Sequence, residues 1–202
     1  MTMVNIDLLL ANGATYKKIS RGNYIFHEGD TCHYYYQLVE GRVRWLNSSD
    51  TGKQLIQSIV EPGQCFGELP LFDDQPYAAC AIAEVNSVII RLSKETFIQL
   101  VKNNNGLLFD FTRLLAQRIR FKFLLLKEFA CYNPEHQVMA LLNHLKANDE
   151  NNHNSHFAVS FTRQQIADML GLRVETVIRT IKKLQQSGRL TIDNRKVVLD
   201  SD

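Results

Sequence analysis

Two side chains near the carboxyl end of the chain, Glu175 and Arg179, have the types and the spacing needed to read DNA bases. An arginine guanidinium can donate two hydrogen bonds to O6 and N7 of guanine, and a carboxylate can accept one from N4 of cytosine. Residues four positions apart lie on one face of a helix, so both groups would enter the same groove. The same spacing also suits an ion pair on a helix surface, and the sequence leaves that alternative open.

The surrounding residues predict the two helices that would position this pair. Thr162 and Gln165 form a capping-box pattern that starts a helix, and Gly171 ends that helix in a tight turn. A second helix is predicted over residues 174–187, because apolar residues recur there at helical spacing. Its predicted buried side consists of Val177, Ile181 and Leu184. Two helices joined by a short glycine turn are typical of the helix-turn-helix, whose second helix enters the major groove of DNA.

The charge of this region favours a polyanionic partner. Residues 163–196 contain eight lysines and arginines against three acidic residues, in a chain whose net charge is only +2. We expect Arg173, Lys182, Arg163 and Gln164 to meet phosphates, which fix register without reading bases. The full predicted DNA-binding set is Thr162, Arg163, Gln164, Arg173, Val174, Glu175, Thr176, Ile178, Arg179 and Lys182.

A short hairpin is predicted to follow the second helix. Residues 190–192 and 196–199 are predicted strands that pair across Asp193–Asn194, the expected two-residue turn. This hairpin would be the wing of a winged helix-turn-helix. A winged helix that serves only protein contacts is the alternative.

The first half of the chain reads as strands and turns. Glycines 29, 41, 52 and 63 recur at intervals of 12, 11 and 11 residues, and glycine supplies the positive φ that tight turns need. The predicted strands cover residues 24–26, 34–39, 43–46, 55–60 and 87–92. A two-layer antiparallel β-roll fits this pattern, and an unrelated small barrel fits the spacing alone.

Three helices are expected between the strands and the helix-turn-helix. Ser93 caps a helix over residues 93–102, which residues 103–106 then break. Residues 107–129 form a long helix with apolar stripes on two sides, one of which needs a partner, and a second copy of the chain is the simplest one. Asn133 and Pro134 start the next helix, and residues 148–156 form a polar loop.

The composition argues against several other classes of protein. Apolar stretches are too short to span a membrane, so we expect no membrane partner and a cytoplasmic location. The four cysteines form no C-x-x-C pair, and the six histidines are scattered, so we expect no metal, no cofactor and no enzyme. The alternative is a small-molecule-binding or metal-binding β-barrel enzyme with a helical appendage that does not bind DNA. A protein-interaction adaptor with a degenerate winged helix is a weaker alternative.

Three segments, in their order and spacing, resemble the CRP/FNR family of bacterial regulators over nearly the whole chain. The first segment is the series of recurring glycines 29, 41, 52 and 63, here called the glycine ladder, which Gly67 continues. The second is the FGELPLF stretch at residues 66–72, which is similar to the family's phosphate-binding cassette. The third is residues 162–179. The resemblance implies an α+β protein, with an antiparallel β-roll sensor of the double-stranded β-helix or jelly-roll type at residues 1–106. A dimerisation helix at 107–131 and a winged helix-turn-helix at 134–202 would follow.

The resemblance also implies partners. It implies a homodimer on a palindromic operator in double-stranded DNA, with the counterparts of Glu175 and Arg179 reading bases. It leaves activation versus repression open, and it suggests RNA polymerase as a further partner through the loop at residues 148–156.

The effector is where this sequence departs from the family pattern. Cyclic-AMP-responsive members that this chain resembles place Arg-Ser where Tyr77 and Ala78 stand, and the arginine holds the cyclic phosphate. Without that guanidinium a buried phosphate lacks its charge partner, so we do not expect cAMP and leave open an unknown small-molecule effector or none. The candidate effector-pocket residues are Phe66, Gly67, Glu68, Leu69, Tyr77, Ala78, Arg118, Lys122 and Phe123.

Overall fold

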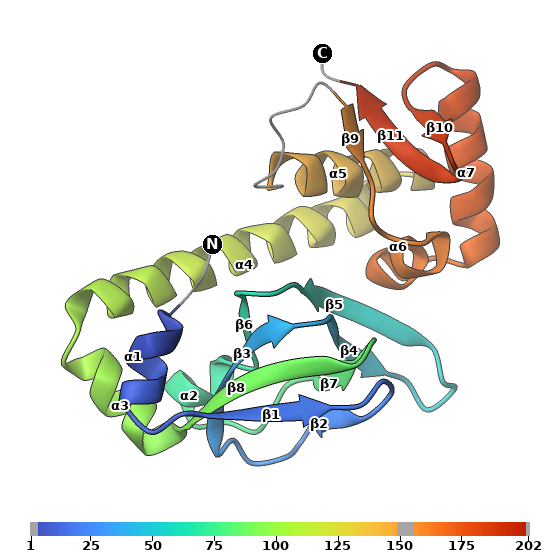
Figure 1. Cartoon of the computed structure of the whole chain (residues 1–202). Helices are drawn as coiled ribbons and strands as arrows, with labels where there is room; N and C mark the ends of the chain where they lie inside the picture. Colours follow the sequence, from blue (N-terminus) through green and yellow to red (C-terminus); the bar gives the residue numbers. More distant parts are fainter. Residues whose placement is uncertain (1–3, 149–155, 201–202) are drawn as a thin grey trace. The chain divides into compact units, whose positions relative to one another are not determined.

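The structure is a computed structural model that describes residues 4–148 and 156–200. The chain divides into two compact units, residues 1–116 and 117–202 (Figure 1). No helix within the described ranges has both the length and the apolar run needed to cross a membrane.

The first unit contains two four-stranded antiparallel sheets, as expected for a two-layer β-roll (Figure 1). One sheet has the order β1-β8-β3-β6 and the other the order β2-β7-β4-β5. The strands are β1 (Thr15–Ile19), β2 (Tyr24–Phe26), β3 (Tyr34–Glu40), β4 (Val43–Ser48), β5 (Gln54–Val60), β6 (Cys65–Phe66), β7 (Cys80–Ala83) and β8 (Ser87–Ser93). All five predicted strands are present within two residues of their expected ends, and β1, β6 and β7 were not predicted.

Aliphatic and aromatic side chains fill the interior of this unit. Leu38, Val43, Ile89 and Ile90 lie at 0% exposure, and they belong to one hydrophobic cluster that draws on both sheets. Each such side chain stabilises the folded state by about 1.5–3 kcal/mol relative to full exposure. The two sheets are therefore held together by the burial of these apolar side chains between them.

The glycines of the ladder occupy the turns that connect these strands. Gly29, Gly41, Gly52 and Gly63 all have positive φ, as their spacing predicted. Gly41 is the most constrained, because a Cβ built on it would lie 2.4 Å from Oγ of Ser87. Its turn therefore requires glycine both for its φ of 96° and for space.

Three short helices border the sheets. They are α1 (Ile6–Ala11), α2 (Leu69–Asp73) and α3 (Lys94–Lys102), of which only α3 was predicted. The Ser93 side chain caps α3 by accepting a hydrogen bond from the amide of Thr96, which confirms the predicted start. Phe97 of α3 is fully buried, and its ring stacks on that of Tyr35 at a centroid distance of 4.5 Å.

The long helix α4 spans Asn105–Cys131 and is longer than predicted at both ends. The expected break is limited to residues 103–104, so Gly106 lies inside the helix and its assignment as a breaker was wrong. The two predicted apolar stripes were partly wrong. Phe111 of the first stripe is buried, whereas Phe109, which lies in neither stripe, is 72% exposed. The first stripe was predicted at residues 108, 111, 115, 119, 126 and 129, and the second at residues 107, 114, 121 and 125.

The second unit carries three further helices and a small sheet of order β10-β11-β9 (Figure 1). The elements are α5 (Pro134–Ala147), β9 (His156–Ala158), α6 (Arg163–Leu170), α7 (Val174–Gln186), β10 (Thr191–Asp193) and β11 (Lys196–Asp200). The Asn133 side chain caps α5 as predicted. Strand β9 was not predicted, and most of the predicted loop, residues 149–155, lies outside the described residues.

Polar contacts hold the junction between α4 and α5. The Gln137 side-chain amide donates to the carbonyl oxygens of Glu128 and Tyr132, at 3.1 and 2.8 Å. The buried Glu128 carboxylate also lies 2.8 Å from Nδ1 of His136. The two hydrogen bonds from Gln137 give polar partners to carbonyl oxygens at the end of α4, where backbone partners run out.

We expect Gly41→Ala to destabilise the first unit by roughly 2–4 kcal/mol, because it adds both backbone strain and a collision with Ser87. Trp45 in β4 is the only tryptophan, so its fluorescence during urea unfolding follows this unit. Gly52→Ala is the matched control, since Gly52 also has positive φ but no atom lies within 4 Å of the added Cβ. Equal losses in the two variants would contradict the packing argument.

Candidate nucleic-acid interface

The start of α6 is fixed by a reciprocal pair of hydrogen bonds. The amide of Gln165 donates to Oγ1 of Thr162 at 3.1 Å, and the amide of Thr162 donates to Oε1 of Gln165 at 2.7 Å. This is the capping box that the sequence predicted. It orients the first turn of α6, where Arg163 and Gln164 lie.

A tight turn links α6 to α7. Gly171 adopts the left-handed conformation with φ of 63°, and the amide of Leu172 donates to the carbonyl oxygen of Ala167 at 3.0 Å. Only Gly171, Leu172 and Arg173 separate the two helices. The predicted helix-turn-helix is therefore present with its predicted stop.

The rotation of α7 about its axis is set by its buried side. Val177, Ile181 and Leu184 are at most 1% exposed, as predicted, and α7 packs on both α5 and α6. An ion pair between Lys183 and Glu135 adds a polar link from α7 to α5. The face of α7 opposite the buried stripe is left at the surface.

That surface face carries the predicted base-reading pair. Glu175 and Arg179 are both exposed, together with Ile178 and Lys182. In the part of the chain that the structure describes, no ion pair joins Glu175 to Arg179, so both groups are available to a ligand. This arrangement does not favour the alternative of a helix-surface ion pair.

The remaining predicted residues surround this face with different degrees of exposure. Thr162, Gln164 and Arg173 are exposed, whereas Arg163, Val174 and Thr176 are half-buried. Burial lowers the pKa of Arg163 below its ordinary value, but a guanidinium stays protonated at neutral pH. The structure thus gathers the whole set on α6, α7 and the turn between them.

The hairpin β10–β11 adds basic residues that were not in the predicted DNA-binding set. Asp193 pairs with Lys196, so the two turn residues are Asn194 and Arg195, and the predicted turn at Asp193–Asn194 was one residue early. Both turn residues have positive φ, at 46° and 67°, as a type I′ turn requires. Arg195 and Lys196 are exposed at this tip.

The candidate effector-pocket residues fall into both units. In the first unit Phe66, Gly67, Glu68 and Tyr77 are buried, and Leu69 and Ala78 are exposed. Gly67 lies against Tyr77, because a Cβ on Gly67 would lie 3.0 Å from the Tyr77 ring.

The other three candidates lie on α4 in the second unit. Arg118 is half-buried, and Lys122 and Phe123 are exposed. The Lys122 ammonium lies 5.8 Å from the centroid of the Phe121 ring. Their assignment to an effector site stays a prediction.

Comparison with known proteins assigns both parts of the chain. Residues 16–104 match the model of the cyclic nucleotide-binding domain, and residues 136–202 match the model of the Crp-like helix-turn-helix domain. The chain belongs to the CRP/FNR family of transcription regulators. Like its relatives, this CRP/FNR regulator binds DNA through its helix-turn-helix.

Relatives match over most of their length. The chain is 27% identical over 177 residues to the cAMP-activated global transcriptional regulator CRP of Salmonella typhimurium, which covers 87% of this chain and 84% of that protein. It is 25% identical over 200 residues to the cAMP-activated regulator Vfr of Pseudomonas aeruginosa, covering 96% and 93%. These relatives are transcription regulators, which argues for a regulatory rather than a catalytic CRP/FNR protein.

Solved structures agree on the fold. The c-di-GMP responsive regulator CLP of Xanthomonas campestris superimposes with a TM-score of 0.78 at 21% identity and covers 98% of each chain. A mutant of CooA from Carboxydothermus hydrogenoformans gives a TM-score of 0.82 at 15% identity, covering 96% of this chain and 85% of that one. At these identities the similarity establishes the fold alone.

The described residues also bear on the metal-dependent alternative. Among residues 4–148 and 156–200, no three histidine, cysteine or acidic side chains gather closely enough to hold a metal ion. The described cysteines are free, and Cys32 and Cys65 are buried.

We expect Thr162→Ala to weaken the start of α6 by about 1 kcal/mol, because the amide of Gln165 loses its acceptor. Hydrogen exchange of the α6 amides should become roughly fivefold faster if they exchange by local opening. Thr162→Ser is the control, since it keeps the accepting oxygen. Identical exchange in the alanine and serine variants would show that the cap does not stabilise α6.

Proposed function

We propose that the chain acts as a homodimer that binds a palindromic operator, with one α7 helix in the major groove of each half-site. The observation that carries this proposal is the exposed face of α7, on which Glu175 and Arg179 project opposite the buried stripe. A family match establishes DNA binding in general, and this face supplies groups that can discriminate between base pairs.

The proposed contacts divide into two kinds. Arg179 donates to O6 and N7 of a guanine, and Glu175 accepts from N4 of a cytosine. Phosphates are contacted by Arg173, Lys182, Arg163 and the neighbouring side chains of the predicted DNA-binding set. These contacts fix the register of α7 on the DNA. Of these, only the contacts made by the base-reading pair depend on operator sequence.

The wing extends the phosphate contacts. Arg195 and Lys196 lie next to each other at an exposed turn with a left-handed backbone. We propose that they bind the sugar-phosphate backbone beside the half-site that α7 reads.

The dimer is proposed from the surface of α4. Seven positions of this helix repeat with alternating steps of three and four residues, and all seven are exposed. They are Phe109, Thr112, Ala116, Ile119, Phe123, Leu126 and Ala130. We call these positions the α4 seam; steps of three and four are the spacing at which two helices pack side by side in a coiled coil.

The apolar content of the α4 seam supports a second copy as its partner. Phe109, Ile119, Phe123 and Leu126 are between 56% and 72% exposed, which is unusual for four large apolar residues of one helix. A two-fold pair of such helices would present two α7 helices to half-sites about 34 Å apart, one turn of DNA.

DNA as the target also supports a cytoplasmic location and a regulatory, non-enzymatic role. RNA polymerase remains a proposed further partner through the loop at residues 148–156, most of which lies outside the described residues.

We expect Arg179→Ala to relax the requirement for one G·C pair in each half-site and to weaken operator binding by about 1–3 kcal/mol per half-site. Selection from random duplexes followed by gel-shift titration measures both effects. Lys182→Ala is the comparison variant: it should weaken binding to all sequences similarly and reduce the slope of log K against log salt by about 0.9 per half-site, or about 1.8 for the dimer. An unchanged base preference in Arg179→Ala would contradict the base-reading role.

We expect Phe123→Glu to dissociate the dimer, because it places a charge within the apolar part of the α4 seam, between Ile119 and Leu126. Sedimentation velocity should show a monomer, and operator affinity should fall because the two half-sites no longer bind together. Gln117→Glu is the matched control, since Gln117 is exposed on α4 but outside the seam. A Phe123→Glu dimer, or a monomeric wild type, would overturn the proposed assembly.

A further inference from the structure

The fold of residues 16–104 implies a cyclic nucleotide, so its interior can be tested for groups that would hold one. A cyclic phosphate taken out of water needs a cationic partner. None of the lysines and arginines in this range is buried. They are Lys17, Lys18, Arg21, Arg42, Arg44, Lys53, Arg91, Lys94 and Lys102.

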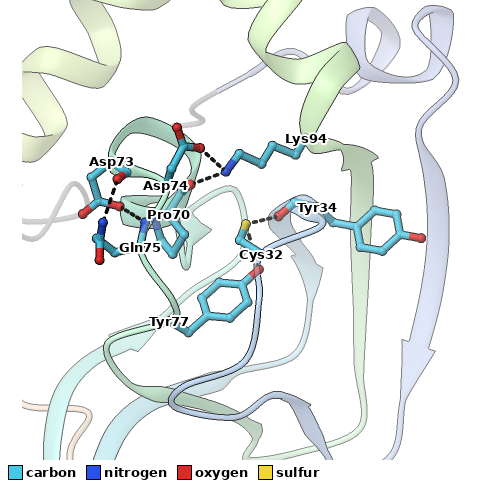
Figure 2. A network of polar contacts seen from close by, with 8 residues as sticks. All are labelled: Cys32, Tyr34, Pro70, Asp73, Asp74, Gln75, Tyr77 and Lys94. Atoms are coloured by element: carbon cyan, nitrogen blue, oxygen red, sulfur yellow. Dashed lines mark hydrogen bonds and ion pairs between the residues drawn. The ribbon is translucent and has the colours of Figure 1, made fainter.

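The half-buried cations among them already have partners within the unit. Arg42 pairs with Glu61 at 2.9 Å, and Lys94 pairs with Asp74 at 2.6 Å while donating to the carbonyl oxygen of Pro70 (Figure 2). The guanidinium of Arg91 lies over the ring of Tyr34. Arg44, the fourth half-buried cation, donates to Oε1 of Gln54 at 3.3 Å. None of the lysines and arginines of this domain therefore combines a buried position with freedom from a contact within the domain.

Tyr77 occupies the position at which the family resemblance expects an arginine, and it points into the domain. Its side chain is 4% exposed, and its ring stacks on that of Phe26 with a centroid distance of 3.7 Å and an angle of 8°. Its hydroxyl donates to Sγ of Cys32 at 3.2 Å (Figure 2). Both ends of the side chain are thus held by the domain itself.

Further rings extend this stack across the interior. Phe26 stacks on Phe66 and Tyr36 at 6.1 and 5.8 Å, and Tyr36 stacks on Phe66 at 5.7 Å. The backbone of Gly67 lies so close beneath them that a Cβ there would be 2.6 Å from the Phe26 ring. The backbone of the predicted cassette therefore faces aromatic side chains of its own chain.

The chemistry of these rings does not replace the missing cation. Burial raises the pKa of Tyr36 to about 12, and burial together with the hydrogen bond to Cys32 raises the pKa of Tyr77 above its ordinary value. Both phenols are therefore neutral at physiological pH, and they give the interior an apolar lining with two hydroxyl groups.

We infer that Tyr77 and Phe26 form an internal plug that fills the ligand site of this domain, so that the protein binds no cyclic nucleotide. The cyclic nucleotide-binding fold then serves as a self-filled structural unit. A second consequence, which rests on the proposed function, is that DNA binding needs no cyclic nucleotide.

The first test measures ligand binding by the full-length wild-type protein. Thermal unfolding followed by Trp45 fluorescence, with cAMP, cGMP or cyclic di-GMP added in millimolar excess, should show no change in midpoint. A ligand that binds only the folded state raises the midpoint, so a saturable increase with any of the three overturns the inference. This readout does not involve DNA, so its outcome is independent of the proposed function.

The second test removes the plug. Tyr77→Ala should lower the unfolding midpoint by several degrees, and added p-cresol, which has the shape of the lost side chain, should restore part of that loss. Tyr77→Phe keeps the ring and should show no response to p-cresol, and Tyr24→Ala, at an exposed tyrosine, should lose little stability and also show no response. If Tyr77→Ala does not fold, Tyr77→Leu leaves a smaller space and benzene replaces p-cresol as the probe.

The results expected with and without an internal plug differ. The plug is supported if an aromatic probe raises the unfolding midpoint of Tyr77→Ala, or of Tyr77→Leu in its place, and of no other variant. It is contradicted if that variant is as stable as wild type, or if no aromatic probe stabilises it. Operator affinity measured with and without each nucleotide completes the test. A nucleotide-dependent gain in affinity overturns the inference, whereas absence of any DNA binding would count against the proposed function and leave the thermal results to decide on the plug.

Discussion

The burial of one side of α7 is the constraint on which the functional surface depends. Val177, Ile181 and Leu184 are held against α5 and α6, so the helix cannot rotate without exposing them to water. Leaving all three exposed would cost about 5–9 kcal/mol by the usual value for a buried aliphatic side chain. The orientation of Glu175 and Arg179 is therefore a consequence of apolar packing on the far side of the same helix. The capping box and the left-handed Gly171 then set where that helix begins relative to α6.

The β-roll is stabilised by glycine turns and by the burial of aromatic and aliphatic side chains. Its two sheets are connected by turns that only glycine fits easily, and its interior contains aromatic rings in addition to branched aliphatic side chains. Stacked rings bury a large area in a defined geometry, which gives a rigid domain. The hydroxyl groups of Tyr35 and Tyr77 find partners in Gln37 and Cys32, so these polar atoms do not weaken the core.

The sequence predicted elements that depend on local chemistry better than elements that depend on distant pairing. The helix-turn-helix was predicted nearly residue by residue, because capping, a stop glycine and helical spacing are all local signals. Strands β1, β6, β7 and β9 were missed, since a short polar strand such as Thr15–Ile19 becomes a strand only by pairing with β8. The wing turn was placed one residue early because left-handed Arg195 resembles no turn former. The α4 seam was missed in part because the apolar residues of that helix cover several sides, and only the fold separates buried Phe111 from exposed Phe109.

The stacked ring of Tyr77 has a consequence for how such a regulator would be controlled. An occupant that is covalently part of the chain is present in every copy of the protein, so its occupancy does not follow the level of any metabolite. Operator occupancy would then rise and fall with the amount of the protein itself. Rates of synthesis and proteolysis would become the inputs to which its target promoters respond.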